Sequence, residues 1–391
     1  MKTLAIFSQN NLTFEKTRKT KPFLLLFNVK INSTKPKKTM RKLLRFLLIF
    51  VAILALIMIF RKSPIKAMAF QEEPNSPYIE KTITGEPETI YPEIAGMEKA
   101  KIDEGILKVI GRDGFYREYS LAQKKEIKKI ELPYKHIDGY DIWADVLYGA
   151  DMNEGLVKIN LKNPAEHEVL VSHFGGRKLV FVDDCIVAKN GDIYFTNASE
   201  VFGADKTTLE TLAMNPTGDI LRYNPRIKTC KMILENKYFP NGLTLLEDQQ
   251  SLIFTETLSR SVKKVHVGED TDFGKVFPLA TGLPSYTDNV FEDEKGNFWV
   301  GLPAQNDPMV SALKNFPKVR EAISKILPLW VANLLTKDSG RFMHMDTKTG
   351  QNTIYNIESK TPKFVTNVVP YNGKIYLSSF TYKGVWVFDE P

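Results

Sequence analysis

The feature that most constrains the fold is a short β-type run that recurs along the chain. Each run combines apolar, β-branched and aromatic residues and is bounded by turn residues. Six runs can be recognised: GILKVI near residue 106, DVLYG near 148, GDIYFT near 194, SLIFT near 253, GNFWVG near 299 and GKIYLS near 376. Most are followed by a second strand-like run, such as GDILRYN or GVWVFD.

The spacing of these runs predicts a β-propeller. Their centres are about 42, 46, 59, 46 and 77 residues apart, and all but the last step are close to the length of one propeller blade. We therefore predict an all-β fold, a six-bladed β-propeller over residues 86–391. A β-sandwich with long loops is the alternative, and it fits the regular spacing less well.

The long last step predicts a helical insertion late in the propeller, at residues 307–339. Its apolar residues recur at helical spacing: Val319, Ala322, Ile323, Ile326 and Leu327. One interpretation is a lid over the propeller mouth with an apolar inner face. The others are an interfacial helix that rests on a membrane and a helix that only stabilises the rim.

The N-terminal part carries an apolar run beside a basic tail. From Leu43 to Phe60 every residue is apolar except Arg45, which is about the length needed to cross hydrocarbon. Residues 1–66 hold fifteen Lys and Arg against one acidic residue, whereas the remainder holds 38 against 45. We predict a basic tail at 1–39, a transmembrane anchor at 40–62 and a proline-containing linker at 63–85.

Charge sets the expected topology. More basic residues precede the apolar run than follow it, which places the N-terminus in the cytoplasm and the propeller outside or in a lumen. The alternative is a secreted protein cleaved near Ala69, and Met40 is an alternative start. Either route exports the propeller and makes Asn197 a candidate glycosylation site. The acidic balance of the propeller argues against nucleic-acid binding.

The usual catalytic and zinc motifs are absent from the sequence, and Cys185 and Cys230 are expected to be buried free thiols. What remains is oxygen chemistry. Several blade starts carry a carboxylate or amide: PETI with Glu88, FVDDCIV with Asp183 and Asp184, FPNGLTL with Asn241, and YTDNVF with Asp288 and Asn289. Inner strands of a propeller run beside its channel, so these oxygens should converge. Such a ring suits Ca²⁺. Asn241-Gly242 can also be interpreted as an ordinary turn with no metal ligand.

Several stretches resemble the strictosidine synthase family: GDIYFTNAS at 191–199, GDILRYNP at 218–225, YFPNGLTL and FTETLSRSV. The later LPSYTDNV and GNFWVGL, with the helical insertion, are similar to the adipocyte plasma membrane-associated branch. This group is related to the gluconolactonases and paraoxonases, which are six-bladed, calcium-dependent propellers. The resemblance covers about residues 140–310 and 364–389.

The resemblance implies roles for individual residues. Asn241 and Asp288 correspond to metal ligands, and Asp288 also to the proposed base. Asp183 stands where relatives often have an amide ligand, and Glu88 is the fourth candidate ligand.

The last blade departs from true strictosidine synthases. Thr366 or Asn367 stands where their catalytic glutamate does, so alkaloid synthase activity is not expected. The paraoxonase branch's catalytic histidine pair also has no counterpart.

We therefore expect a membrane-anchored, Ca²⁺-dependent hydrolase of hydrophobic esters or lactones. In it, Ca²⁺ polarises the carbonyl group while Asp288 takes a proton from water. The alternative is a non-catalytic membrane-anchored propeller that binds a ligand or protein partner, with Ca²⁺ holding the channel together.

Overall fold

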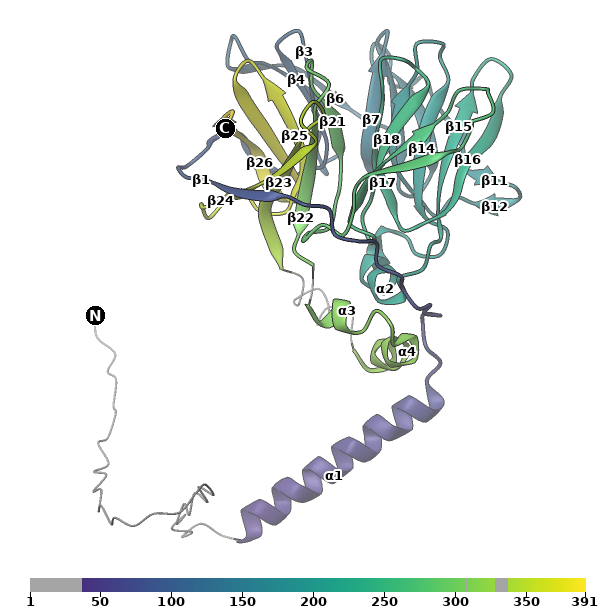
Figure 1. The fold of residues 1–391 in the computed structure, drawn as a ribbon, viewed down its shortest axis with the longest axis vertical. Helices are drawn as coiled ribbons and strands as arrows, with labels where there is room; N and C mark the ends of the chain where they lie inside the picture. Colours follow the sequence, from purple (N-terminus) through teal and green to yellow (C-terminus); the bar gives the residue numbers. More distant parts are fainter. Residues whose placement is uncertain (1–36, 307, 328–336) are drawn as a thin grey trace, which may run out of the picture. The chain divides into compact units, whose positions relative to one another are not determined.

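The computed structural model describes residues 37–306, 308–327 and 337–391 (Figure 1). The chain divides into two compact units, Met1–Ala55 and Leu56–Pro391. Helix α1 (Lys37–Phe60) carries exposed apolar side chains such as Leu43, Phe46 and Phe60. Among the described residues, no helix combines the length and hydropathy needed to cross a membrane. The predicted transmembrane anchor is thus not confirmed, and most of the predicted basic tail lies outside the described residues.

Within the described residues the strands form six antiparallel blades, so the predicted six-bladed propeller is confirmed. The first two blades are β3 (Ala100–Asp103), β4 (Ile106–Ile110), β5 (Phe115–Ser120), β6 (Lys125–Glu131), and β7 (Ile137–Trp143), β8 (Val146–Asp151), β9 (Gly155–Asn160), β10 (His167–Val171). The next two are β13 (Phe181–Val187), β14 (Ile193–Ser199), β15 (Gly218–Asn224), β16 (Thr229–Lys237), and β17 (Pro240–Leu245), β18 (Ser251–Glu256), β19 (Ser261–His266), β20 (Val276–Ala280).

The last two blades close the ring with strands from both ends of the propeller. The fifth blade is β21 (Val290–Glu292), β22 (Phe298–Ala304), β23 (Asp338–Asp346) and β24 (Gln351–Ile357), with β1 (Ile79–Ile83) parallel at its edge. The sixth is β25 (Val365–Tyr371), β26 (Lys374–Asp389) and β2 (Glu88–Met97). A small hairpin, β11 (His173–Phe174) and β12 (Arg177–Lys178), precedes the third blade.

The apolar core lies between adjacent blades. One cluster joins Tyr194 and Ile220 of the third blade to Leu243 and Phe254 of the fourth. A strand in the middle of a blade is covered on both faces, and β14 and β22 are accordingly buried along their whole length. Asn197 of β14 is therefore inaccessible, and its Oδ1 accepts a hydrogen bond from the Phe181 amide. The folded chain does not offer Asn197 for glycosylation.

The segment expected to be a linker, residues 63–85, is packed against the propeller. We call residues 61–76 the strap. Ile65 and Phe70 of the strap are buried, and Glu72 makes ion pairs with Arg260 and Lys314. The segment ends in β1, which pairs with β24. Residues 63–85 are therefore an integral part of the folded unit.

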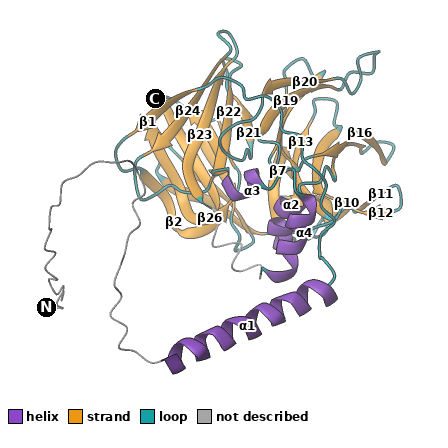
Figure 2. Cartoon of the chain, turned by 60° about the horizontal axis from the view of Figure 1, so that its bottom comes forward, coloured by secondary structure: helices purple, strands orange, loops and turns teal. Residues whose placement is uncertain are grey.

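Short helices gather at one end of the propeller (Figures 1 and 2). The β14–β15 connection holds the single 3-10 turn η1 (Ala204–Lys206) and α2 (Thr207–Ala213), and the β22–β23 connection holds α3 (Pro308–Ala312) and α4 (Pro317–Ile326). The helical insertion is thus confirmed over 308–327, and residues 328–336 lie outside the described part.

The orientation of α4 differs from the predicted apolar inner face. The buried residues of α4 are Arg320 and Ser324, whereas Val319 and Ile326 are exposed. Arg320 is drawn inward because its Nη1 donates to the carbonyl oxygens of Leu212 and Ala213, each at 2.8 Å. These carbonyls are at the C-terminal end of α2 and have few partners within their own helix. Of the predicted apolar stripe only Leu327, just after α4, lines the pocket, so α4 itself does not present the apolar inner face of the lid interpretation.

Candidate functional site

A pocket of about 260 Å³ lies where the channel meets the helical end of the propeller. Its floor is polar and is formed by residues from successive blades: Glu98, Asp138, Asp183, Asn241 and Asp288. Its walls are mainly apolar and include Phe181, Phe239, Leu258, Phe364 and Phe380. At the mouth, Leu212 comes from α2, Val310 from α3 and Leu327 from the end of α4. The pocket thus joins an apolar entrance to an acidic floor.

Irregular strand pairing brings the polar side chains to the floor. The innermost strands β7, β13 and β17 each break register at the same place in the blade, between Ile137 and Tyr140, Val182 and Cys185, and Pro240 and Leu243. Each break contains a pocket residue: Asp138, Asp183 and Asn241. A bulge re-aims a side chain that would otherwise follow the strand's alternation.

The four carboxyl groups of the floor lie in an environment that disfavours their charge. Burial is the largest cause and raises the pKa of Glu98, Asp138 and Asp183 well above the usual range, as it does for Asp288. The next cause is the negative charge of a neighbour: Asp288 acts on Glu98, Glu98 on Asp138, Asp138 on Asp183 and Asp183 on Asp288. These groups therefore form a closed ring of mutual repulsion that either protons or a cation would relieve.

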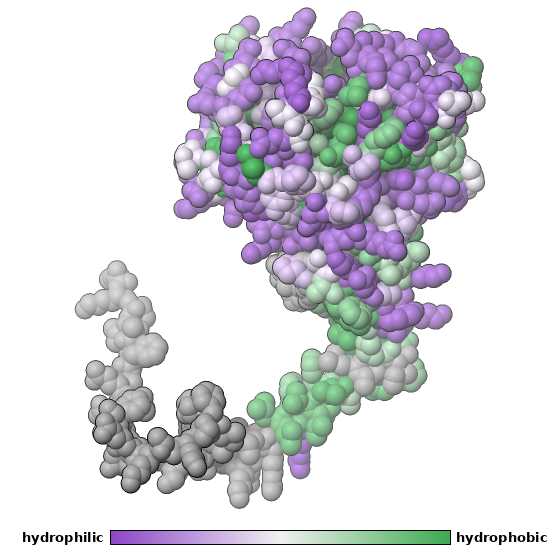
Figure 3. All heavy atoms as spheres, in the orientation of Figure 1, coloured by the Kyte–Doolittle hydropathy of each residue, from purple (hydrophilic) through white to green (hydrophobic). Residues whose placement is uncertain are grey.

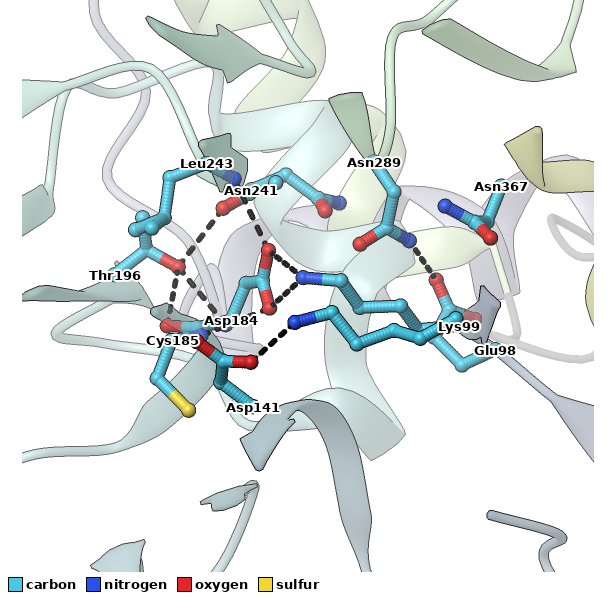
Figure 4. A network of polar contacts seen from close by, with 12 residues as sticks. Glu98, Lys99, Asp141, Asp184, Cys185, Thr196, Asn241, Leu243, Asn289 and Asn367 are labelled. Carbon is cyan, nitrogen blue, oxygen red and sulfur yellow. Dashed lines mark hydrogen bonds and ion pairs between the residues drawn. The ribbon is translucent and has the colours of Figure 1, made fainter. Parts of the chain in front are cut away.

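Amide side chains complete the floor. Asn289 Nδ2 donates to Glu98 Oε1 at 3.0 Å and to Asp288 Oδ1 at 3.2 Å. Asn241 is held through its backbone, whose carbonyl oxygen accepts a hydrogen bond from Thr196 Oγ1 at 2.9 Å (Figure 4). Its side chain is left to line the pocket.

A buried ion pair lies beside the floor. Lys99 Nζ donates to both oxygens of Asp184, at 2.6 and 2.7 Å (Figure 4). The same carboxylate accepts the amides of Cys185 at 2.8 Å and Leu243 at 3.0 Å. Asp184 thus has a cation supplied by the chain itself and links three blades, whereas the adjacent Asp183 faces the pocket.

The structure brings Asp183, Asn241 and Asp288 together at the floor, as the sequence predicted, but it does not bring Glu88 there. Glu88 is the exposed first residue of β2 and pairs with Lys124 Nζ at 3.1 Å. Glu98 occupies the floor instead, ten residues further along the chain. That these residues bind metal stays a prediction.

Sequence reasoning missed Glu98 and Asp138. For Asp138 a signal existed, because Asp138-Gly139 repeats the Asn241-Gly242 pattern at the start of an inner strand. For Glu98 the signal was its place just before β3, the innermost strand of the first blade.

The donor set fits a hard divalent cation such as Ca²⁺. In the described part of the chain, no three His, Cys, Asp or Glu side chains are already arranged to hold a metal ion. Asp183 Oδ2, however, is buried and has no hydrogen-bond partner among the described residues. A buried carboxylate oxygen without a partner, in a ring of like charges, calls for a cation. Carboxylate and amide oxygens are the ligands that Ca²⁺ prefers.

The fold is a six-bladed β-propeller, and solved propellers share it. A gluconolactonase from Xanthomonas campestris aligns with a TM-score of 0.54 at 14% identity, covering 82% of this chain and 99% of that one. Regucalcin from Agrobacterium tumefaciens, described as a calcium-binding protein, aligns with a TM-score of 0.53 at 12% identity, covering 78% and 94%. At these identities the likeness concerns the fold alone.

The sequence carries the likeness further. Residues 183–270 match the strictosidine synthase family model. Strictosidine synthase-like 13 of Arabidopsis thaliana is 33% identical over 199 residues, which cover 51% of this chain and 48% of the relative. Adipocyte plasma membrane-associated protein of Danio rerio is 28% identical over 247 residues, covering 60% and 58%. The chain thus spans about half of these relatives' length. The resemblance to strictosidine synthase-like proteins stated from the sequence is confirmed.

Proposed function

We propose that the protein hydrolyses hydrophobic esters or lactones with the help of a divalent cation, Ca²⁺, held at the pocket floor. The observation that carries this proposal is the combination of apolar walls with four buried carboxyl groups at one end of the pocket. Aromatic and aliphatic walls favour an apolar substrate body, because its burial removes apolar surface from water. The names of the gluconolactonase and calcium-binding neighbours are consistent with this chemistry.

The chain would hold the cation with Glu98, Asp183, Asn241 and Asp288, and the charge of Asp138 would add to the attraction. When bound, Ca²⁺ polarises a carbonyl oxygen and stabilises negative charge that develops on it. The carboxyl ring supplies the ligand charge, and the Asn289 amide fixes the relative positions of Glu98 and Asp288.

Asp288 would accept the proton of the attacking water. In the metal-free protein, burial and the neighbouring Asp183 charge raise its pKa. A bound cation would oppose this shift and keep Asp288 ionised, which is the form that accepts a proton. The Asn289 side chain holds one of its oxygens, Oδ1. This leaves Asp288 positioned to serve a substrate on the pocket side.

Thr257 is positioned to orient the polar end of the substrate. It lines the pocket, and its Oγ1 is buried with no hydrogen-bond partner among the described residues. A buried hydroxyl without a partner gains a hydrogen bond when a ligand oxygen reaches it. Thr257 and Asp288 would thus address different atoms of one substrate.

The test is turnover of phenyl acetate and of alkyl-substituted lactones by the purified full chain, with Ca²⁺ or with EGTA. We expect turnover that EGTA removes and that Asp288→Asn reduces by at least about 100-fold, as for the loss of a general base. The exposed Asp103→Asn serves as the matched control and should retain full turnover. Turnover that survives both EGTA and Asp288→Asn would refute the proposal.

The alternative is a propeller that binds a ligand or partner without catalysis. The last blade favours this alternative, because the side chains of Thr366 and Asn367 form hydrogen bonds with the backbone at the start of the first blade and stand where a catalytic carboxylate would be expected. Thr366 Oγ1 donates to the Glu98 carbonyl oxygen at 2.7 Å, and Asn367 Oδ1 accepts from the Ala100 amide at 3.0 Å. Stabilisation by Ca²⁺ without turnover of any ester or lactone would support this alternative.

Attachment to a membrane through α1, with the propeller on the extracytoplasmic side, is a further part of the proposal. It is supported by the exposed apolar side chains of α1 and by a relative whose name describes it as plasma membrane-associated. The test is alkaline carbonate extraction of the expressed full chain, with a chain that starts at Arg61 as the comparison. Extraction of both chains alike would contradict attachment by α1.

A further inference from the structure

We propose that α4 and the strap form a docking face for a lipid bilayer with anionic headgroups, beside the mouth of the pocket. The docking face consists of the apolar residues Met68, Phe316, Val319 and Ile326 and the basic residues Lys62, Lys66 and Lys318. This inference goes beyond attachment by α1 and does not depend on catalysis.

The apolar part of the docking face is exposed although it lies on a helix that packs against the propeller. The exposed fraction is 56% for Phe316, 43% for Val319, 37% for Ile326 and 53% for Met68. A helix that only covered a rim would turn such residues inward and its charged residues outward. Here the arginine is inside and the valine and isoleucine are outside, which is the arrangement of a helix that contacts a second apolar phase.

Hydrogen bonds hold the strap and α4 as one surface. Ser63 Oγ lies 3.0 Å from Ser324 Oγ, and the Ala67 amide donates to Glu321 Oε1 at 3.2 Å. Arg320 bonds to the carbonyl oxygen of Met68 and to that of Lys314. These contacts hold the strap beside α4, so that the exposed Met68 lies near the helix that carries the exposed Val319 and Ile326.

Ile65 anchors this face to the propeller. Its buried side chain packs with Leu209 and Leu212 of α2. Figure 3 shows apolar and hydrophilic surface side by side at this helical end. The docking face is therefore a fixed surface of the folded unit.

Charge favours a bilayer with anionic headgroups over an apolar protein partner. Residues 61–68 contain three basic residues, Arg61, Lys62 and Lys66, and no acidic one. Lys318 adds a side chain that is 88% exposed, although its Nζ pairs with Glu321 Oε2 at 2.9 Å. The residues from 67 onward carry an excess of acidic groups, so the basic character is local to this face. Apolar side chains ringed by lysines are typical of surfaces that enter the headgroup region of anionic membranes.

The position of the docking face explains how an apolar ligand would reach the pocket. Leu212, Val310 and Leu327 line the mouth and come from the same group of helices. A bilayer in contact with α4 would lie next to this mouth, so an apolar ligand could pass from lipid to pocket without crossing bulk water.

The test places a fluorophore on the docking face of the full chain bound to vesicles. Val319→Cys is labelled in a Cys230→Ser background, since Cys185 is buried. Ile227→Cys, exposed in the turn after β15, is the matched control. Vesicles of phosphatidylcholine with about one third phosphatidylserine are separated by flotation, and quenching by doxyl-labelled lipid is measured.

We expect strong quenching at position 319 and little at 227. We also expect at least about a threefold weaker quenching at 319 in phosphatidylcholine alone or after Lys62→Gln, Lys66→Gln and Lys318→Gln together. Protein that floats with the vesicles but is quenched equally at both positions, or at neither, would refute the docking face while leaving attachment by α1 intact. Quenching at 319 that is independent of phosphatidylserine and of the lysines would refute the requirement for anionic headgroups.

Discussion

Gly139 and Gly242 lie where the backbones of neighbouring blades approach each other closely. A Cβ atom at 242 would be 2.4 Å from Asn289 Cα, and one at 139 would be 2.5 Å from Asp184 Cα. Neither glycine has a left-handed φ. The Asn241-Gly242 pair is therefore no turn, and its glycine is required by close packing of backbones. The adjacent Asn241 lies in the register break of β17 and lines the pocket.

Gly242→Ala should lower the free energy of unfolding by about 1–3 kcal/mol, because a methyl group there has to displace the backbone at Asn289. Gly203→Ala is the matched control, since the nearest atom to its added Cβ is 3.4 Å away, an ordinary contact. Urea unfolding of both variants measures the difference. Equal stability of the two would show that the backbones can separate freely.

Lys99→Met should destabilise the protein by about 3–5 kcal/mol, because it leaves the Asp184 carboxylate buried without its cation. The exposed pair Lys124–Glu88 provides the control, and Lys124→Met should cost less than about 1 kcal/mol. Lys99→Arg should recover part of the loss. Urea unfolding that found Lys99→Met as stable as Lys124→Met would rule out a role for the buried pair.

Glu88, at the start of β2, and Glu98, just after its end, offer a direct test of the site. Glu98→Gln should abolish the Ca²⁺-dependent rise in melting temperature, because it removes a ligand charge from the floor. Glu88→Gln should leave that rise unchanged, since Glu88 is exposed at the outer edge. Differential scanning calorimetry with Ca²⁺ and with EGTA makes the comparison. The reverse result would restore Glu88 as the ligand.

At the scale of elements, α4 shows that the spacing of apolar residues can predict a helix without predicting which of its faces is buried. The spacing of its apolar residues predicted a helix correctly, because that pattern is local. It gave the wrong buried face, because the buried side is fixed by hydrogen bonds from Arg320 to carbonyl groups more than a hundred residues away in the chain. A single sequence contains no trace of such a partner.

Arg320→Met should therefore loosen α2 and the strap together. Removing the guanidinium leaves the carbonyl groups of Leu212 and Ala213 without this hydrogen-bond donor. Each unpaired group should lower the free energy of unfolding by about 1–3 kcal/mol. Hydrogen–deuterium exchange should rise in α2 and in residues 61–70 while the central strands stay protected. Lys318→Met, two residues earlier and exposed, should leave exchange unchanged. Uniform exchange across the propeller in Arg320→Met would contradict the coupling.

At the scale of the whole molecule, ring closure decides which glutamate reaches the channel. Blade number was predictable because each blade is a local repeat. The assignment of Glu88 to the start of the first blade failed because β2 pairs with β26 and completes the sixth. The innermost strand of the first blade is β3, and Glu98 lies in the two-residue connection between β2 and β3. Closure between the two ends of the propeller is a non-local pairing that strand patterns do not encode.

Ring closure also gathers four carboxyl groups into one cavity, which links stability to pH and to calcium. Because burial and mutual repulsion raise their pKa values, the folded, metal-free protein binds more protons than the unfolded chain. Their favourable contribution is complete below the ordinary carboxyl pKa, about 4. It is lost as the pH rises through the raised values, so stability in EGTA should fall from pH 5 to pH 8.

Calcium should reverse this trend, because it replaces the protons and is bound more tightly as the pH rises. At a hundred times the dissociation constant it should add about 2.7 kcal/mol to the free energy of unfolding. We therefore expect the difference in melting temperature between Ca²⁺ and EGTA to widen from pH 5 to pH 8. Titration calorimetry in buffers of different ionisation enthalpy should show protons released on binding. A difference that is constant over this range, with no proton release, would mean that Ca²⁺ binds away from the carboxyl ring.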